Sequence, residues 1–182
     1  MWKFDLAALR TGISWGETPI ITTTLSAVVA LVLYRRWRKS RGQLQPSGKT
    51  VLITGCDSGI GYIVARWLDK LGFTVYAGCL FADGDGAQKL KDSCSTRLRI
   101  IQLDITDAQQ VAKAVATIEE SLSPAEGLYG LVNNAGILSM GALEWYPDAH
   151  WTQVVDVNIK GTFRVTKSFL PLIRRGRGKY IL

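Results

Sequence analysis

From residue 50 onward, short apolar runs alternate with longer stretches in which apolar residues recur at helical spacing. The short runs are rich in β-branched residues and are bounded by glycine or polar residues, which is typical of buried strands. The longer stretches carry one apolar face and predict amphipathic helices. This pattern predicts strands at residues 50–54, 73–77, 98–103, 128–132 and 179–182, and helices at 60–71, 86–94, 108–122, 145–158 and 162–174.

Regular alternation of strand and helix predicts an α/β fold built on a parallel sheet. The strands read as continuous apolar runs, so both faces of the sheet should be covered by helices. Right-handed crossovers between such strands produce a doubly wound sheet. In that architecture ligands bind in the crevice at the carboxyl ends of the strands.

The turn between the first strand and the first helix is rich in glycine and reads Thr54-Gly55-Cys56-Asp57-Ser58-Gly59-Ile60-Gly61. Gly55 allows a tight turn, Gly59 lets the backbone approach phosphate groups, and Gly61 lets helix and sheet pack closely. The free N–H groups and the positive dipole end of the following helix favour an anion at this place. We therefore predict a Rossmann-type domain that binds the pyrophosphate of a dinucleotide.

An uncharged stretch at residues 20–34 is followed by five basic residues within residues 35–41. We expect this stretch to be a membrane anchor, although it is shorter than the span of about 20 residues that a bilayer requires. The basic residues follow the apolar run, which argues against a cleaved signal peptide and places the rest of the chain in the cytosol. We expect the endoplasmic reticulum membrane; the mitochondrial inner membrane and a buried helix remain alternatives.

Charge and composition divide the chain further. Residues 1–49 carry a net charge of +6 and residues 50–182 only +1, so the folded part has no excess of basic residues for nucleic-acid binding. Three cysteines without paired spacing favour a reducing compartment, and no cluster of ligand residues suggests a metal. We divide the chain into an N-terminal segment at 1–41, a linker at 42–49 and a nucleotide-binding domain at 50–182.

The fourth predicted strand ends in Asn133-Asn134-Ala135-Gly136. With this run and the glycine turn in the same order, residues 50–182 resemble the short-chain dehydrogenase/reductase family. The segments 72–80 and 166–175 resemble the subgroup that holds D-β-hydroxybutyrate dehydrogenase, microsomal retinol dehydrogenases and estradiol 17-β-dehydrogenase type 2. The resemblance implies that Ile137 helps to line the cofactor site. It implies that the cofactor is bound by Gly55, Ser58, Gly59, Ile60, Gly61, Asp104, Asn133, Asn134, Ala135 and Gly136.

Two of these implied roles have alternatives in physical terms. Asp104 matches the acid that meets the adenine ring, but an aspartate there could equally cap a helix or a turn. Asn158 matches the asparagine of the family's catalytic tetrad, which kinks a helix and holds a water of the proton relay. An asparagine within an apolar helix needs a polar partner in any case.

The identity of the dinucleotide follows from charge. NAD-binding domains usually place an acid at the end of the second strand to hold the ribose 2′-OH. That position falls near Cys79, and no acid is there. Asp83 lies a few residues beyond the end of the predicted strand. Neither the glycine turn nor residues 77–80 offer a Lys or Arg for a 2′-phosphate, and Asp57 would repel one, so we expect NAD rather than NADP.

The remaining catalytic groups implied by the resemblance are a serine, a tyrosine and a lysine four residues after that tyrosine. None of the six tyrosines has a lysine at that spacing, so Asn158 is the only tetrad residue we assign. We expect these 182 residues to contain a C-terminally truncated domain of a membrane-associated dehydrogenase that acts on a lipophilic alcohol or hydroxy acid. A homo-oligomer is possible for the full-length protein. The alternative is a non-catalytic nucleotide-binding module or partner subunit.

Overall fold

The computed structural model describes residues 31, 34–35 and 46–181, and the fold begins at Pro46. The anchor predicted at residues 20–34 lies outside the described residues except for Leu31 and Tyr34. Within the described ranges, no helix combines the length and the apolar character that crossing a bilayer requires.

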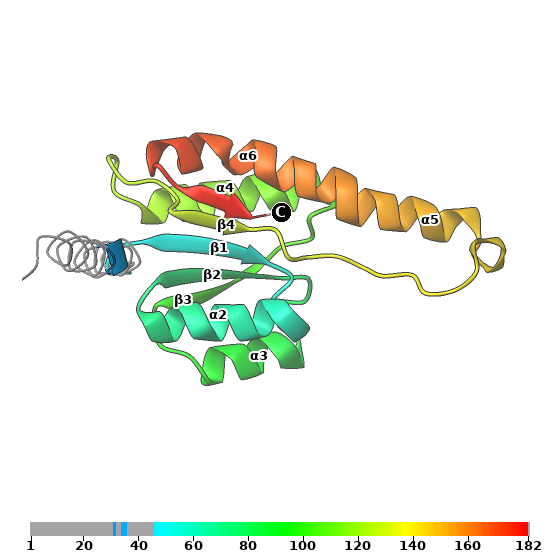
Figure 1. Ribbon diagram of the computed structural model, residues 1–182, viewed down its shortest axis with the longest axis horizontal. Coiled ribbons are helices and arrows are strands. Elements are labelled where there is room, and N and C mark those ends of the chain that lie inside the picture. Colours follow the sequence, from blue (N-terminus) through cyan, green and yellow to red (C-terminus); the bar gives the residue numbers. More distant parts are fainter. Residues whose placement is uncertain (1–30, 32–33, 36–45, 182) are drawn as a thin grey trace, which may run out of the picture. The chain divides into compact units, whose positions relative to one another are not determined.

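Five parallel strands form one sheet in the order β3-β2-β1-β4-β5 (Figure 1). The strands are β1 (Thr50–Thr54), β2 (Thr74–Cys79), β3 (Leu98–Gln102), β4 (Gly130–Val132) and β5 (Lys179–Ile181). The strand order reverses between β1 and β4, which leaves the crevice of a doubly wound sheet at their carboxyl ends. The predicted α/β fold and the parallel sheet are confirmed.

Helices cover the sheet on two sides (Figure 1). One side carries α2 (Gly59–Leu71) and α3 (Asp85–Asp92), and the other carries α4 (Ala108–Ser121) and α6 (Thr162–Arg175). Between β4 and α6 the chain forms the 3₁₀ turn η2 (Leu143–Trp145), the helix α5 (Asp148–Val155) and the π-helix η3 (Asp156–Gly161). The segment from β4 to α5 extends away from the sheet.

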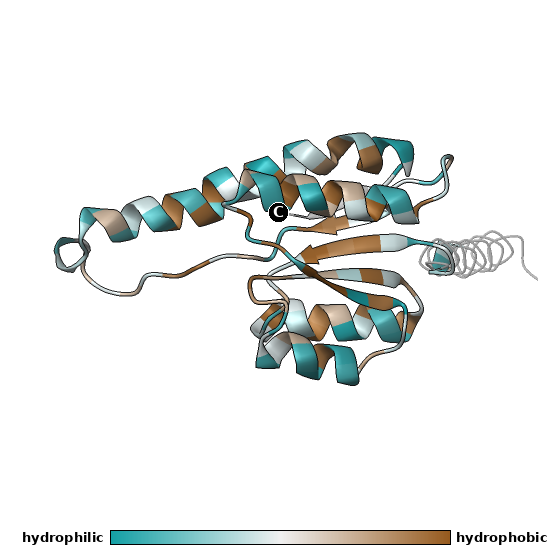
Figure 2. Ribbon diagram, turned by 180° about the vertical axis from the view of Figure 1, so that it is seen from behind, coloured by the Kyte–Doolittle hydropathy of each residue, from teal (hydrophilic) through white to brown (hydrophobic). Residues whose placement is uncertain are grey.

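Two hydrophobic clusters, one on each face of the sheet, hold these layers together. Alternate residues of β1 point to opposite faces, so Val51 and Ile53 join the cluster beneath α2 and α3, and Leu52 joins the one beneath α4 and α6. All three are buried, and the strands are hydrophobic along most of their length (Figure 2). The continuous apolar runs in the sequence thus reflect burial on both faces.

The largest departure from prediction concerns the two helices expected at 145–158 and 162–174. The structure instead shows an uninterrupted helical run from Asp148 to Arg175, with η3 where a break was expected. Gly161 does not end a helix; a Cβ at this position would lie 2.7 Å from Cγ1 of Ile105, so the glycine permits close packing. The run begins at Asp148 because Pro147 precedes it and fixes the backbone there.

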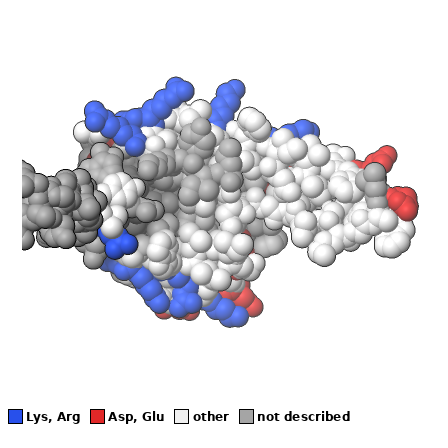
Figure 3. All heavy atoms as spheres, viewed as in Figure 1, with Lys and Arg blue, Asp and Glu red and all other residues white. Residues whose placement is uncertain are grey.

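The other predicted boundaries lie within two residues of those observed. Helix α2 ends at Gly72, whose φ of 99° is the left-handed conformation typical of a glycine cap. On the face shown in Figure 3, basic side chains gather along the edge over α6, whereas both signs of charge occur along the edge over α2 and α3. This face therefore carries no continuous basic surface.

Candidate functional site

The glycine turn at the end of β1 has the geometry of a phosphate cradle. Gly55 has a φ of 71° and lies so close to Ala135 that a Cβ would be 2.7 Å from Cα of that residue. A Cβ on Gly61 would be 2.2 Å from the carbonyl oxygen of Gly55. Gly59 also has a positive φ, 62°, but a Cβ there would meet nothing within 4 Å. The turn is therefore closely packed beneath Gly55 and Gly61 and open above Gly59.

Ser58 occupies the position before α2, and its side chain makes no capping hydrogen bond. The first backbone hydrogen bond of the helix runs from the N–H of Tyr62 to the carbonyl oxygen of Ser58. The earlier amide groups of α2 thus lack a side-chain cap at the open side of the turn. Backbone donors at a helix N-terminus and space above Gly59 fit a pyrophosphate group.

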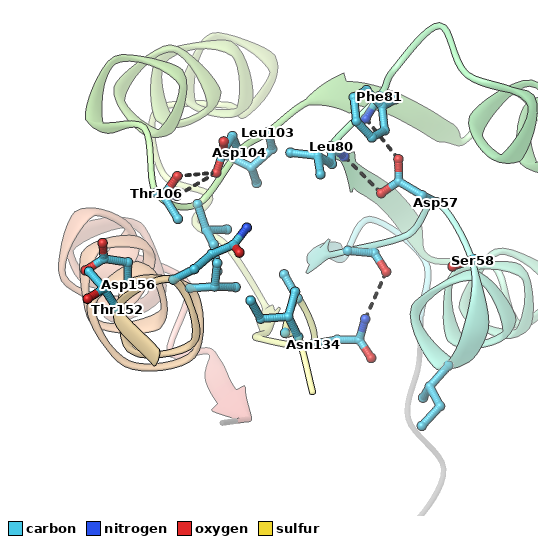
Figure 4. Close-up of a pocket in the computed structure, with 18 of the residues that line it drawn as sticks. Asp57, Ser58, Leu80, Phe81, Leu103, Asp104, Thr106, Asn134, Thr152 and Asp156 are labelled. Carbon is cyan, nitrogen blue, oxygen red and sulfur yellow. Dashed lines mark hydrogen bonds between the residues drawn. The ribbon is translucent and has the colours of Figure 1, made fainter. Parts of the chain in front are cut away.

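The run that follows β4 is hydrogen-bonded to the glycine turn 80 residues away. The side-chain amide of Asn134 donates to the carbonyl oxygens of Thr54 and Gly55, both at 2.9 Å. Figure 4 shows one of these two hydrogen bonds. In return, Oγ1 of buried Thr54 accepts from the backbone N–H groups of Asn134 and Ala135, both at 3.0 Å. Four hydrogen bonds therefore join the two motifs into one wall.

The two remaining asparagines of this region connect the chain after β4 with the helical run that includes η3 and α6. The side-chain amide of Asn133 donates to Oγ1 of Thr166 on α6 at 3.0 Å. Asn158 lies in η3 and makes two hydrogen bonds with the backbone of Ile137. Its side-chain oxygen accepts the N–H of Ile137, and its side-chain nitrogen donates to the carbonyl oxygen of Ile137. Asn158 thus has a polar partner, the chain leaving β4, although its side chain is exposed and not enclosed in an apolar helix face.

Carboxylates lie at the ends of β2 and β3. Both oxygens of Asp57 accept backbone N–H groups just after β2, from Leu80 and from Phe81, each at 2.9 Å (Figure 4). Asp104 accepts the N–H and the hydroxyl of Thr106 on one oxygen, at 2.8 and 2.7 Å. Asp104 therefore stabilises the turn after β3, which is the alternative role that the sequence left open. It also lines the cleft.

These elements surround a cleft of about 720 Å³. Three of its lining residues are charged, and all three are acids, Asp57, Asp104 and Asp156; the described residues that line it include no Lys or Arg. Asp156 pairs with Lys160 one helical turn away, at 2.6 Å. The predicted residues that line the cleft are Gly55, Ser58, Ile60, Asp104, Asn134, Ala135, Gly136 and Ile137.

Four other predicted residues, Gly59, Gly61, Asn133 and Asn158, lie outside this lining. Gly61 instead permits close packing of the turn, Asn133 bonds the side chain of Thr166, and Asn158 bonds the backbone of Ile137. The far wall of the cleft was not predicted, and it consists of Ala149, Thr152, Gln153, Asp156 and Val157. These residues are spaced three and four apart, which places them on one face of a helix. This spacing is the feature of the sequence from which a shared helix face could have been predicted.

Two cysteines lie buried beside the glycine turn. Burial raises the pKa of the Cys79 thiol to about 12, and the nearby charge of Asp57 contributes in the same direction. Burial likewise raises the pKa of Cys56 well above its usual range, with further contributions from Cys79 and Asp57. Both thiols are therefore protonated near neutral pH, which fits a packing role for Cys56.

Comparison with known proteins identifies relatives of this domain. A family model described as short chain dehydrogenase matches residues 49–182. The chain is 50% identical over 138 residues to mitochondrial D-beta-hydroxybutyrate dehydrogenase of Mus musculus, covering 74% of this chain and 40% of the relative. It is 42% identical over 183 residues to 17-beta-hydroxysteroid dehydrogenase type 2 of Homo sapiens, with coverages of 99% and 46%.

A third relative, retinol dehydrogenase 7 of Mus musculus, is 39% identical over 158 residues, with coverages of 86% and 49%. Among solved structures, NADPH-bound carbonyl reductase from chicken fatty liver superposes with a TM-score of 0.63 at 26% identity, covering 74% of this chain and 52% of the reductase. The chain thus spans less than half the length of these three relatives. With its fold, glycine turn and matched residues, this chain belongs to the short-chain dehydrogenase family.

Proposed function

We propose that this chain binds NAD and that the protein to which it belongs interconverts an alcohol and its carbonyl compound. The observation that carries the proposal is the hydrogen-bonded joint between the glycine turn and Asn134, which borders an open cleft. Gly55, Gly59 and Gly61 would shape the pyrophosphate site, and Ser58 and Ile60 would provide its backbone. Bound NAD supplies the hydride acceptor for alcohol oxidation.

Other residues of the cleft would position the rest of the dinucleotide. Asp104 would meet the adenine ring at the end of β3, where it lines the cleft beside Thr106. Asn134, Ala135 and Gly136 would form the wall under the nicotinamide half. Asn133 and Asn158 would hold that wall through Thr166 and Ile137, and Asn158 is the residue we assign to the catalytic tetrad.

The substrate class is proposed from the relatives and from the exposed apolar segment that follows Ile137. The relatives are named for hydroxybutyrate, a steroid and retinol. Beyond Ile137, the chain that extends from the sheet exposes three large apolar side chains, Leu138, Met140 and Trp145. An exposed apolar segment that continues from the cleft residue Ile137 favours a lipophilic alcohol, and a hydroxy acid is the alternative.

A second candidate function is nucleotide binding without turnover. The family reaction requires a tyrosine with a lysine four residues on, and these 182 residues contain no such pair. The residues proposed to bind the nucleotide are all among the residues that the structure describes. A non-catalytic module or partner subunit would therefore retain NAD binding and show no dehydrogenase activity.

Binding and turnover can be tested on the same preparation. We expect NAD⁺ to bind the full chain in isothermal titration calorimetry and the Gly59→Trp variant to bind none, because the indole would fill the open space above the turn. Lack of binding by the wild-type chain would contradict the nucleotide site. Turnover of an alcohol with NAD⁺, abolished in the variant, would contradict the second candidate.

We further propose that residues 1–41 attach the protein to a membrane, with the anchor at about 20–34 and the domain from residue 50 in the cytosol. The support is the uncharged stretch followed by its basic flank. The endoplasmic reticulum is favoured and the mitochondrial inner membrane is the alternative. Deleting residues 1–41 should release the domain from carbonate-washed membranes; a deleted form that still pellets with them contradicts the anchor.

A further inference from the structure

Asp57 belongs to the glycine turn, but its carboxylate lies at the end of a different strand. Cys79 is the last residue of β2, and the next two residues, Leu80 and Phe81, donate their N–H groups to the two oxygens of Asp57. Figure 4 shows this bidentate contact at the border of the cleft. A residue 23 positions upstream thus provides the acidic group at this strand end.

The end of the second strand is the place where an acid holds the ribose 2′-OH in NAD-binding domains. Here β2 is followed by Leu80 and Phe81, and the first acid after the strand, Asp83, lines a neighbouring hollow and not the main cleft. Asp57 lines the main cleft. We propose that Asp57 binds the ribose 2′-OH and is the residue that selects NAD over NADP; this inference rests on the proposed function.

The hydrogen bonds of Asp57 are compatible with that role. Each of its oxygens accepts one backbone N–H group, and a carboxylate has about four acceptor positions, so it retains the capacity to accept a hydroxyl. Its backbone is also closely packed, because a Cβ on Gly86 at the start of α3 would lie 1.9 Å from the carbonyl oxygen of Asp57. The packed backbone and the two N–H contacts together hold the carboxylate at the border of the cleft.

The charge of the cleft opposes a 2′-phosphate. All three of its charged lining residues are acids, and none of the described lining residues is basic. A phosphate monoester adds a charge of about −1.5 to −2 at pH 7. Next to Asp57 this charge would meet a carboxylate instead of the Lys or Arg that a 2′-phosphate needs.

The test compares two ligands that differ only in the 2′-phosphate. The dissociation constants of NAD⁺ and NADP⁺ are measured by isothermal titration calorimetry with the full chain, with Asp57→Asn and Asp57→Ser, and with Asp92→Asn. Asp92 is an exposed acid on α3 that bonds Gln88, so its variant makes the same change in net charge away from the cleft. Circular dichroism establishes that each variant is folded.

We expect wild type and Asp92→Asn to prefer NAD⁺ by at least about tenfold, and the Asp57 variants to lose about tenfold or more of that preference. In wild type the preference should also decrease with added salt, because screening weakens the repulsion of the 2′-phosphate. This second measurement decides the matter if neither Asp57 variant folds.

An unchanged preference in folded Asp57 variants, or one insensitive to salt, overturns the role of Asp57 and leaves the proposed function standing. Failure of wild type to bind either dinucleotide overturns the proposed function and this inference with it. The two failures are therefore distinguishable.

Discussion

The side-chain amide of Asn158 makes two hydrogen bonds with a single residue, Ile137. Its oxygen accepts the N–H of Ile137 at 2.9 Å, and its nitrogen donates to the carbonyl oxygen of Ile137 at 2.8 Å. The chain that leaves β4 is thereby held to η3, in which the helical run changes from α to π geometry. A π segment within an α-helix often marks a functional site, and this one borders the cleft through Asp156 and Val157.

Replacing Asn158 with alanine should remove both hydrogen bonds. Because Asn158 is exposed and Ile137 partly exposed, water can replace the lost partners, so we expect a loss of only about 1 kcal/mol in the free energy of unfolding. Urea denaturation measures this loss, with Lys167→Ala on the exposed side of α6 as the control. Asn158→Asp keeps the acceptor and loses the donor, and it should be intermediate; equal stability of all variants would contradict the proposed contact.

Two glycines of the turn should respond differently to alanine. A Cβ on Gly61 would lie 2.2 Å from the oxygen of Gly55 and 2.4 Å from Nδ2 of Asn134, so Gly61→Ala must displace backbone. We expect it to destabilise the fold by about 3 kcal/mol and to weaken nucleotide binding as the joint with Asn134 opens. Gly59→Ala meets no atom and carries only the cost of its positive φ, about 1–2 kcal/mol.

Urea denaturation of both variants tests this contrast. The order of the two effects matters more than their size, since both substitutions add the same methyl group to the same turn. If Gly59→Ala were the more damaging substitution for stability, the packing described beneath Gly61 would be wrong.

The hydroxyl of Thr54 should contribute strongly to stability. It accepts two backbone N–H groups, from Asn134 and Ala135, and it is buried. Thr54→Val keeps the shape but leaves both donors without their acceptor, for an expected loss of about 2–4 kcal/mol. The same substitution at Thr50, also buried on β1, is the control and should cost less; equal losses would show that the two N–H groups find other partners.

The parts of the fold that the sequence predicted are those determined by local pattern. Strands β1 and β2 are almost entirely buried, β3 is apolar at three of its five positions, and α2 and α4 repeat their apolar residues at helical spacing, so burial and periodicity agree. The glycine turn could also be predicted from the sequence. Gly55 and Gly59 adopt positive φ angles, which glycine tolerates because it has no Cβ atom to clash with the backbone.

The parts that the sequence did not predict depend on contacts between distant residues. Nothing near Gly161 in the sequence indicates that it packs against Ile105, and the sequence predicted two helices where the structure has one continuous helical run. Asp57 could be read only as a repulsive charge in its own turn, because its partners Leu80 and Phe81 become neighbours only when β1 and β2 pair. The helix face that completes the cleft was missed for the same reason.

The three thiols should differ in reactivity because their burial differs. At pH 8 the raised pKa values of Cys56 and Cys79 leave almost no thiolate, and both side chains are buried, whereas Cys94 is partly exposed. We expect iodoacetamide to label native protein first at Cys94, even though burial raises the pKa of that thiol too. Peptide mass spectrometry locates the label, and urea should make all three cysteines react.

The same shift has a consequence for stability at high pH. A Cys79 pKa raised from 9.0 to about 12 means that the unfolded chain loses this proton at lower pH than the folded chain. The contribution to stability is therefore complete below about pH 9 and is lost as the pH rises from 9 toward 12. Between pH 8 and pH 10, the free energy of unfolding should decline more in wild type than in Cys79→Ser, whereas parallel declines would mean that Cys79 ionises normally in the folded protein.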